Sequence, residues 1–237
     1  MKNRRRTAVI TGGTGALGSV VATAFLDKGA HIAIPYHSDR SLAAIPSGWT
    51  KAPDQVMLMK ADITLESDVQ KFCAQAVERF GGIDYLLNIA GGYAGGSTIA
   101  ETSLEEWERM LDLNLKTAFL MSRQVLPIMM GAHFGRIVNI TSKQAVLPGA
   151  KAGAYAVAKR GIVTLTEILA DEVKGTGITV NALAPSVILT DANRQAMNES
   201  DFSRWVSPEE LTTLILHICS DESKSVNGNI VKVFGGG

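Results

Sequence analysis

Short apolar runs alternate with helical segments along almost the whole 237-residue chain, and this alternation limits the possible folds more than any other feature. The runs typical of buried strands are Ala8–Ile10, Ile32–Ile34, Val56–Met59, Ile83–Ile89, Arg136–Ile140, Ile178–Leu183 and Asn229–Phe234. The segments typical of helices are Leu17–Lys28, Leu65–Phe80, Leu104–Met130, Gly153–Lys174 and Pro208–Ser220. Such alternation predicts an α/β, doubly wound (Rossmann-type) fold, in which a parallel sheet of about seven strands carries helices on both faces.

The crossover between the second and third strands is the weakest part of this pattern. Between Ile34 and Gln55 only Ser41–Ile45 has a helical pattern, and we expect Pro46 and Gly48 to stop it. No Pro-rich or Ser-rich linker divides the chain, so residues 1–237 are predicted to form a single domain.

Composition and charge exclude several classes of function. The 23 basic and 23 acidic residues balance, and the basic run Lys2–Arg6 is typical of a solvated tail, so we expect no nucleic-acid partner. No apolar stretch reaches the roughly 18–20 residues of a membrane span, and Met1–Thr7 lacks the apolar core of a signal peptide. We therefore expect no membrane partner and a cytoplasmic location. Neither the isolated Cys73 and Cys219 nor the 4 histidines show metal-ligand spacing, so no metal site is predicted.

A glycine-rich turn, T-G-G-T-G-A-L-G at Thr11–Gly18, joins the first strand to the first helix. Backbone N–H groups at such a turn can bind the pyrophosphate of a dinucleotide. Glycines also end strands for steric reasons, but here Asp62 follows the third strand, where a carboxylate could accept hydrogen bonds near an adenine. The context favours a cofactor site.

Tyr155 and Lys159 stand four residues apart in A-Y-A-V-A-K, thirteen residues after Ser142. Residues at this spacing share a helix face, so we expect the Lys159 ammonium to lower the pKa of Tyr155 from about 10 toward neutrality. Such a tyrosine could transfer a proton near pH 7. Together with the glycine turn, this pair indicates an oxidoreductase.

These motifs resemble those of the short-chain dehydrogenases/reductases, and the resemblance covers essentially the whole chain. The glycine turn is similar to the family's T-G-x-x-x-G-x-G, with Ala16 in place of the middle glycine. Asn88–Gly91 resembles its N-N-A-G, with Ile89 as the departure, and Pro185-Ser186 with Thr190 resembles the P-G and Thr that border the nicotinamide.

The resemblance implies a catalytic set of Asn114, Ser142, Tyr155 and Lys159. Tyr155 would exchange a proton with the substrate oxygen during hydride transfer, Ser142 would hydrogen-bond that oxygen, and Lys159 would bind the nicotinamide ribose. Asn114 would interrupt its helix to hold a water molecule that links Lys159 to solvent. The implied cofactor-binding residues are Gly12, Thr14, Gly15, Ala16, Leu17, Gly18, Tyr36, His37, Ser38, Asp62, Ile63, Asn88, Ala90, Gly91, Tyr155, Lys159, Pro185, Ser186, Val187 and Thr190.

The end of the second strand bears on the choice of cofactor. NAD-specific enzymes usually place Asp or Glu there to bind the ribose 2′-OH, but the segment after Ile34 has no carboxylate until Asp39. His37, Ser38 and Arg40 could accommodate a 2′-phosphate, although Gly15 lacks the basic side chain of many NADP-dependent relatives. We therefore predict NADP, with NAD as the alternative.

A narrower resemblance, to dihydropteridine reductases, bears on the substrate. It rests on Ala90–Gly96 and on Asn193-Arg194, Met197, Asp201–Ser203 and Trp205. Tyr93, Phe202 and Trp205, with Ser142, are accordingly the predicted substrate residues. Those reductases lack the serine, however, and carry an acid after the second strand. A carbonyl or alcohol substrate, such as a ketone or a 3-oxoacyl carrier-protein thioester, is therefore placed first, and quinonoid dihydropterin second.

Two further expectations concern the class of protein and its assembly. A non-catalytic dinucleotide sensor is the alternative from another class, since a fold does not fix a function. Relatives pair the helix predicted at Gly153–Lys174, whose Ala154 and Ala158 allow close contact, across two-fold axes. The resemblance thus implies a homotetramer, with a homodimer next.

Overall fold

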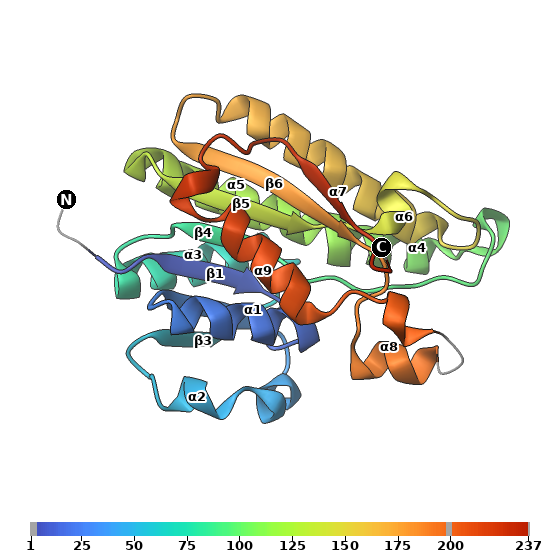
Figure 1. Ribbon diagram of the computed structural model, residues 1–237, viewed down its shortest axis with the longest axis horizontal. Coiled ribbons are helices and arrows are strands. Elements are labelled where there is room, and N and C mark those ends of the chain that lie inside the picture. The colour runs from blue at the N-terminus through green and yellow to red at the C-terminus, as the bar shows by residue number, and fades with distance from the viewer. Residues whose placement is uncertain (1–3, 198–200, 237) are drawn as a thin grey trace.

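The computed structural model describes residues 4–197 and 201–236, which form one seven-stranded sheet in the order β3-β2-β1-β4-β5-β6-β7 (Figure 1). All six strand pairings are parallel. The strands are β1 Thr7–Thr11, β2 His31–Tyr36, β3 Val56–Lys60, β4 Tyr85–Asn88, β5 Gly135–Ile140, β6 Ile178–Pro185 and β7 Ile230–Val233. The predicted doubly wound α/β fold is confirmed. Strand order reverses between β1 and β4, the point at which such sheets bind ligands beyond their carboxyl ends.

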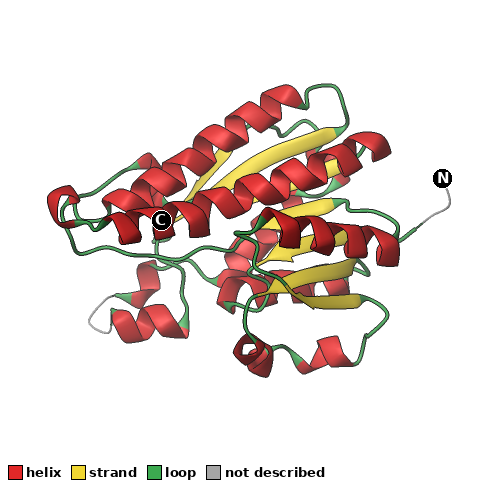
Figure 2. Ribbon diagram, turned by 180° about the vertical axis from the view of Figure 1, so that it is seen from behind, coloured by secondary structure: helices red, strands yellow, loops and turns green. Residues whose placement is uncertain are grey.

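Helices cover both faces of the sheet, and Figure 2 shows the long ones lying across one face. The helices are α1 Ala16–Asp27, α2 Ser47–Thr50, α3 Glu66–Phe80, α4 Leu104–Leu111, α5 Thr117–Ala132, α6 Lys143–Val146, α7 Gly153–Glu172, α8 Asp191–Ala196 and α9 Pro208–Ile218. Successive residues of β1 point to opposite faces: Ile10 joins the core under α1 and α9, and Val9 joins the core under α3, α5 and α7. The sheet is thus buried on both sides, as its unbroken apolar strands require.

The second crossover differs from the expectation. A 3₁₀ turn at Asp39–Ala44 is followed by α2, so Pro46 precedes a new helical turn rather than stopping all helical structure. Trp49 explains this: it is buried, and its Nε1 donates a hydrogen bond of 3.1 Å to Thr23 Oγ1 on α1. Burial of a large aromatic side chain outweighs the weak helical tendency of the segment.

The helix predicted over Leu104–Met130 is also interrupted. Between α4 and α5 the chain forms a π-helical segment at Asp112–Lys116. Asn114 Nδ2 donates a hydrogen bond of 3.0 Å to the carbonyl of Met110. In a regular α-helix this carbonyl would accept the hydrogen bond from the backbone N–H of Asn114. Among the described residues, no helix has both the length and the apolar character that crossing a bilayer requires.

Candidate active site

The glycine turn lies where β1 ends, next to the reversal in strand order. Gly12 adopts φ +67°, and a Cβ there would come within 2.9 Å of the Ala90 backbone, so both its conformation and its surroundings require glycine. A Cβ on Gly18 would collide with the carbonyl of Gly12. Together these contacts hold the start of α1 close against the ends of β1 and β4.

The first turn of α1 is open to an anion. Its N-cap is Gly15, no side chain caps it, and it contains no acidic residue. Its unpaired N–H groups and the positive end of the helix dipole therefore fit a pyrophosphate. Ala16, which replaces the family's middle glycine, is exposed at the first helical position, where a methyl group is tolerated. Thr14 is half-buried in the turn, and Leu17 packs into the core.

Thr11 and Gly91 connect this turn to the catalytic candidates. Thr11 Oγ1 accepts hydrogen bonds of 3.1 Å from the N–H groups of both Ile89 and Ala90. A Cβ on Gly91 would lie 2.6 Å from Asn114 Oδ1 and 3.1 Å from Lys159 Nζ. The structure therefore brings the end of the Asn88–Gly91 segment, Asn114 and Lys159 together at one point.

Asn114 is fully buried and holds the chain after β4. Its Oδ1 accepts from the Gly92 N–H at 3.2 Å, and its Nδ2 donates to the Gly92 carbonyl at 3.1 Å. The predicted interruption of its helix is present. The side-chain amide itself, bound also to the Met110 carbonyl, is engaged in fixing this loop.

Lys159 is a buried cation without a carboxylate partner among the ion pairs of the described residues. Its Nζ donates to the carbonyl of Ile140 at 2.9 Å, at the end of β5. Burial lowers the pKa of Lys159 to about 8. Thr141 Oγ1 donates to the Lys159 carbonyl at 2.7 Å and so fixes α7 to the end of β5.

The expected effect of Lys159 on the pKa of Tyr155 is wrong for this arrangement. The pKa of Tyr155 is raised, mainly by burial, while Ser142 acts in the opposite direction and lowers it. The Lys159 ammonium lies 5.9 Å from the centre of the Tyr155 ring and is directed to the Ile140 carbonyl. Sequence spacing places the two residues on one helix face but does not fix where the ammonium points.

Ser142 and Tyr93 both lie beside Tyr155. Ser142 is buried and caps the start of α6, where its Oγ accepts a hydrogen bond of 3.2 Å from the Gln144 N–H. The ring of Tyr93 meets that of Tyr155 edge to face, with 5.1 Å between centroids and 76° between planes. Of the predicted substrate residues, Ser142 and Tyr93 thus adjoin Tyr155.

Phe202 and Trp205 lie on a separate excursion of the chain after β6. Their rings pack on each other at 4.8 Å, and no aromatic contact among the described residues joins them to Tyr155 or Tyr93. The excursion is closed at its base where Val206 donates to the carbonyl of Val187. Residues 198–200, within it, lie outside the described part of the chain.

The residues that follow β6 connect this excursion to the end of the chain. Pro185 is the last residue of β6, and Ser186 Oγ donates to the carbonyl of Phe234 at 2.6 Å. Thr190 caps α8 by accepting from the Asn193 N–H at 3.2 Å. The Ser186 hydroxyl, which replaces the family's glycine, is thus used in a structural bond.

The ends of β2 and β3 form the exposed margin of the site. His37 and Ser38 are exposed, and His37 Nε2 lies 3.9 Å from Asp62 Oδ2. Hydrogen bonds from Thr64 lower the pKa of Asp62. Asp39 is paired with Lys60 at 3.2 Å, whereas no ion pair of the described residues includes Arg40. Tyr36 and Ile63 are half-buried beside them.

The side chain of Asn88, a predicted cofactor-binding residue, is hydrogen-bonded within the protein. It is buried, and its Nδ2 donates to Asn139 Oδ1 at 2.8 Å and to Ser122 Oγ at 3.3 Å, on the α5 side of the sheet. Asn139 in turn donates to Thr166 Oγ1 on α7 at 2.8 Å. This network joins β4, β5, α5 and α7, so the Asn88 amide supports the site from beneath. Its sequence signal was a polar residue at the end of an apolar strand, in the segment that resembles N-N-A-G.

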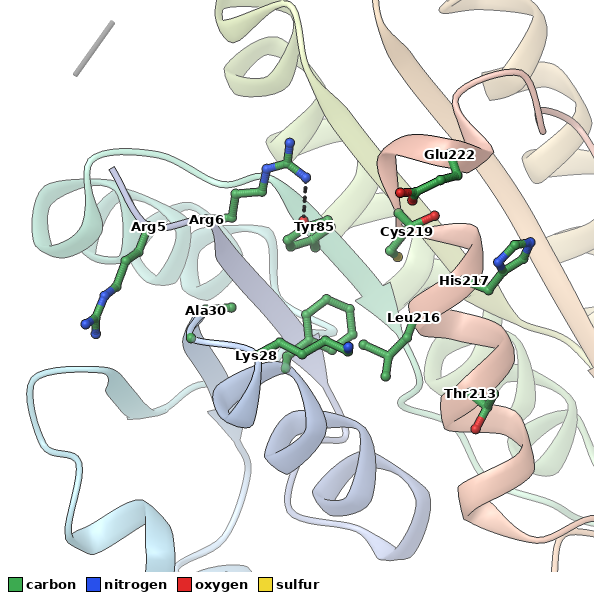
Figure 3. A pocket seen from close by; sticks show the side chains of 13 residues that line it. Arg5, Arg6, Lys28, Ala30, Tyr85, Thr213, Leu216, His217, Cys219 and Glu222 are labelled. Atoms are coloured by element: carbon green, nitrogen blue, oxygen red, sulfur yellow. Dashed lines mark hydrogen bonds between the residues drawn. The ribbon is translucent and has the colours of Figure 1, made fainter. Parts of the chain in front are cut away.

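A cavity of about 690 Å³ lies away from these residues, between the carboxyl ends of α1 and α9 (Figure 3). Its lining includes Phe25, Leu216 and Tyr85, whose hydroxyl accepts a hydrogen bond of 2.9 Å from Arg6. None of the predicted site residues lines it. The candidate active site is therefore the cluster at the carboxyl ends of the strands.

Comparisons with known proteins agree with this geometry. The family model for short chain dehydrogenases matches residues 6–201. A short-chain type dehydrogenase/reductase of Picea abies is 32% identical, covering 98% of this chain and 92% of its own. A 3-oxoacyl-[acyl-carrier-protein] reductase of Thermotoga maritima is 28% identical, covering 100% and 99%. A D-beta-hydroxybutyrate dehydrogenase of Cupriavidus necator is 30% identical, covering 98% and 97%.

Among solved structures, a Bacillus thuringiensis protein provisionally described as a 3-oxoacyl-reductase superposes with a TM-score of 0.86. It is 31% identical, and the match covers 97% of this chain and 96% of that one. The agreement extends over the whole sheet and the elements that carry the catalytic candidates. The chain belongs to the short-chain dehydrogenase family and is an NAD(P)-dependent oxidoreductase that acts on alcohol or carbonyl groups.

Proposed function

We propose that this protein is an NADP-preferring carbonyl reductase whose proton donor is Tyr155. The observation that carries the proposal is that Asn114 Oδ1 and Lys159 Nζ lie together beside Gly91, and that Lys159 shares α7 with Tyr155. A ketone or a 3-oxoacyl thioester is the favoured substrate class, because relatives named for 3-oxoacyl and hydroxybutyrate chemistry match over nearly the whole chain.

The cofactor contacts follow from the shape of the site. The open first turn of α1 and the glycines at 12 and 18 would bind the pyrophosphate, and Lys159 would bind the nicotinamide ribose. Asp62 and Ile63 would lie near the adenine, and Ala90, Gly91 and the Pro185–Thr190 segment near the other end. When bound, the cofactor supplies the hydride for the substrate carbon.

Tyr155 would donate its hydroxyl proton to the carbonyl oxygen as that oxygen gains negative charge, and Ser142 would stabilise the same oxygen by a hydrogen bond. Burial raises the pKa of Tyr155, so the phenol keeps its proton at neutral pH. This state suits the reduction of a carbonyl group. Oxidation of an alcohol needs the phenolate as the base, so we expect that direction to be favoured at higher pH.

The preference for NADP is proposed from the end of β2. The position at Tyr36 lacks the carboxylate that would repel a 2′-phosphate, and His37, Ser38 and Arg40 are exposed beside it. Asp39, the next acid along the chain, is paired with Lys60, and Asp62 lies 3.9 Å from His37.

The test is a spectrophotometric assay of nicotinamide oxidation with purified protein. NADPH and NADH would each be offered with a panel of ketones, aldehydes and acyl thioester analogues, and with quinonoid dihydropterin. We expect carbonyl-dependent oxidation of NADPH. Binding of NADPH without turnover of any of these compounds would contradict the proposal.

Reduction of quinonoid dihydropterin is the second candidate. The contact of Tyr93 with Tyr155 favours it, because an aromatic ring beside the proton donor suits a flat heterocycle. Dihydropterin turnover that exceeds every carbonyl rate in the same panel would establish this alternative.

We also propose a homotetramer, or failing that a homodimer, in the cytoplasm. Phe119 on α5 and Val157 and Ile168 on α7 are apolar and between 44% and 50% exposed, which favours burial against another copy. The two cysteines are free and buried, which suits a reducing compartment. A single monomeric species in light scattering at micromolar concentration would contradict the assembly.

A further inference from the structure

The glycine-rich segment Ala90–Gly96 is bound at one end to the π-helical segment that carries Asn114 and at the other to the turn before α7. At its start, Gly91 adjoins Asn114 and Lys159. A Cβ on the next residue, Gly92, would lie 2.7 Å from Cδ2 of Leu113, which precedes Asn114 in the π-helical segment. Near its end, the Gly96 N–H donates to the Lys151 carbonyl at 2.7 Å, four residues before Tyr155. The loop therefore has little freedom to move relative to the site.

These anchors determine where Tyr93 lies. A Cβ on Gly95 would overlap the Tyr93 hydroxyl and come within 2.9 Å of the Lys151 carbonyl, so the absence of a side chain there makes room for the phenol. The Tyr93 ring meets the Tyr155 ring edge to face at 5.1 Å. Nevertheless 65% of Tyr93 is exposed, which leaves an unusually large aromatic surface uncovered beside the proton donor.

We propose that Tyr93 determines specificity: it forms the wall along which a carbonyl group reaches the Tyr155 hydroxyl, and it selects compounds whose carbonyl carbon bears a planar aryl or conjugated substituent. A flat substituent can pack on the free surface of Tyr93 while the carbonyl oxygen faces Tyr155 and Ser142, whereas a flexible alkyl chain covers less of that surface. This inference rests on the carbonyl reduction proposed above and adds the substrate class.

A second consequence concerns Tyr155 itself. Tyr93 covers part of the Tyr155 ring, and burial is the main cause of the raised pKa of Tyr155, to which Tyr93 also contributes by charge repulsion. Removal of the Tyr93 ring should therefore lower the pKa of Tyr155 because it admits water. Replacement by phenylalanine keeps the cover and removes only the Tyr93 hydroxyl, so the shift in the pKa of Tyr155 should be smaller.

The experiment compares kcat/KM for acetophenone and for 2-octanone in the wild type, Tyr93→Phe and Tyr93→Ala. Ile99→Ala is the control, because it removes an apolar side chain that lies three residues beyond the loop and is equally exposed, at 65%. We expect the wild type to prefer acetophenone, Tyr93→Phe to keep that preference within about twofold, and Tyr93→Ala to lose about five- to tenfold of it. Ile99→Ala should keep the wild-type ratio.

A phenolate absorbance titration of the same variants supplies a readout besides turnover. The chain has only 4 tyrosines, so a Tyr155→Phe reference can assign the Tyr155 transition. We expect this transition at lower pH in Tyr93→Ala. The role of Tyr93 would be overturned if an active Tyr93→Ala protein kept the wild-type ratio of kcat/KM for acetophenone to that for 2-octanone, or if its Tyr155 transition stayed at the wild-type pH. Either result would leave the proposed carbonyl reduction in place. Failure of the wild type to reduce any carbonyl compound would instead overturn the proposed function, and with it this inference.

Discussion

The catalytic cluster and the end of β2 border the same edge of the sheet but are built in opposite ways. In the cluster, Asn114, Lys159 and Ser142 are 0%, 4% and 8% exposed, and each hydrogen-bonds to a neighbouring backbone group. At the end of β2, by contrast, the His37 side chain is 79% exposed and its nearest charged partner is 3.9 Å away.

This difference predicts how each region responds to change. Buried polar groups act in a low-dielectric setting and cannot be replaced by water, so the loss of one should be costly and insensitive to salt. Exposed charges act through screened contacts, so their effects should be smaller and should weaken as ionic strength rises.

The largest expected effect is that of Tyr155→Phe, which removes the proposed proton donor and keeps most of the side-chain shape. Turnover should fall by about 10²–10⁴-fold, the usual range for a positioned general acid. Cofactor affinity should change little. Steady-state kinetics and a cofactor titration would measure both, and a variant that retains more than about a tenth of wild-type turnover would remove Tyr155 from the proposed mechanism.

A second prediction concerns the buried charge of Lys159. Its pKa is about 8 in the folded protein, below the value of about 10.4 expected in the unfolded chain. Between these values the unfolded state binds more protons, so the stability of the wild type should rise with pH across this window, relative to Lys159→Met, by up to about 3 kcal/mol.

Urea unfolding of both proteins at several pH values between 7 and 11 would measure this difference. Other groups that titrate in both proteins, such as Tyr155, contribute similarly to the pH dependence of both stabilities, so their contributions largely cancel in the difference. A constant stability difference between the two proteins would show that Lys159 is not held as a costly buried cation.

The exposed region should give a smaller, salt-dependent effect. NADPH should bind more tightly than NADH by about ten- to a hundredfold, or roughly 1.5–3 kcal/mol, the size of one charge-assisted contact to the 2′-phosphate. This ratio should shrink as salt is raised. Isothermal titration at two salt concentrations would test it, and equal or inverted dissociation constants would refute the role given to His37, Ser38 and Arg40.

Gly91→Ala should give the smallest of these effects, about tenfold in turnover. The added methyl would stand 2.6 Å from Asn114 Oδ1, and small overpacking of this kind typically costs about 1–3 kcal/mol. Gly131→Ala on α5 is the control, because its Cβ would meet nothing within 4 Å. Equal turnover of the two variants would show that the contact at Gly91 does not affect activity.

The fold and the positions of the catalytic candidates were accessible from the sequence because they depend on regular patterns. Hydrophobic periodicity located every strand, and the spacing of Tyr155 and Lys159 placed them on one helix. Features that depend on particular tertiary contacts were not accessible. The helical turn at Trp49 and the inward direction of Asn88 each depend on hydrogen bonds to another element of the fold.

The pKa of Tyr155 could not be predicted from the sequence either. Spacing alone suggested that Lys159 lowers the pKa of Tyr155, but the ammonium binds the Ile140 carbonyl and burial dominates the pKa of the phenol. The position of Tyr93 was predicted only as a substrate contact. Its edge-to-face packing on Tyr155 depends on how Gly95 lets the loop close.

The most direct test of the central claim, carbonyl reduction at the buried cluster, is the turnover of Ser142→Ala with the true substrate. Loss of one oriented hydrogen bond to the developing alkoxide should lower turnover by about 10²–10³-fold, or roughly 2.7–4 kcal/mol. We expect this loss with cofactor binding intact. Turnover retained within about threefold in Ser142→Ala, while Tyr155→Phe is nearly inactive, would contradict it and favour reduction of a quinonoid pterin.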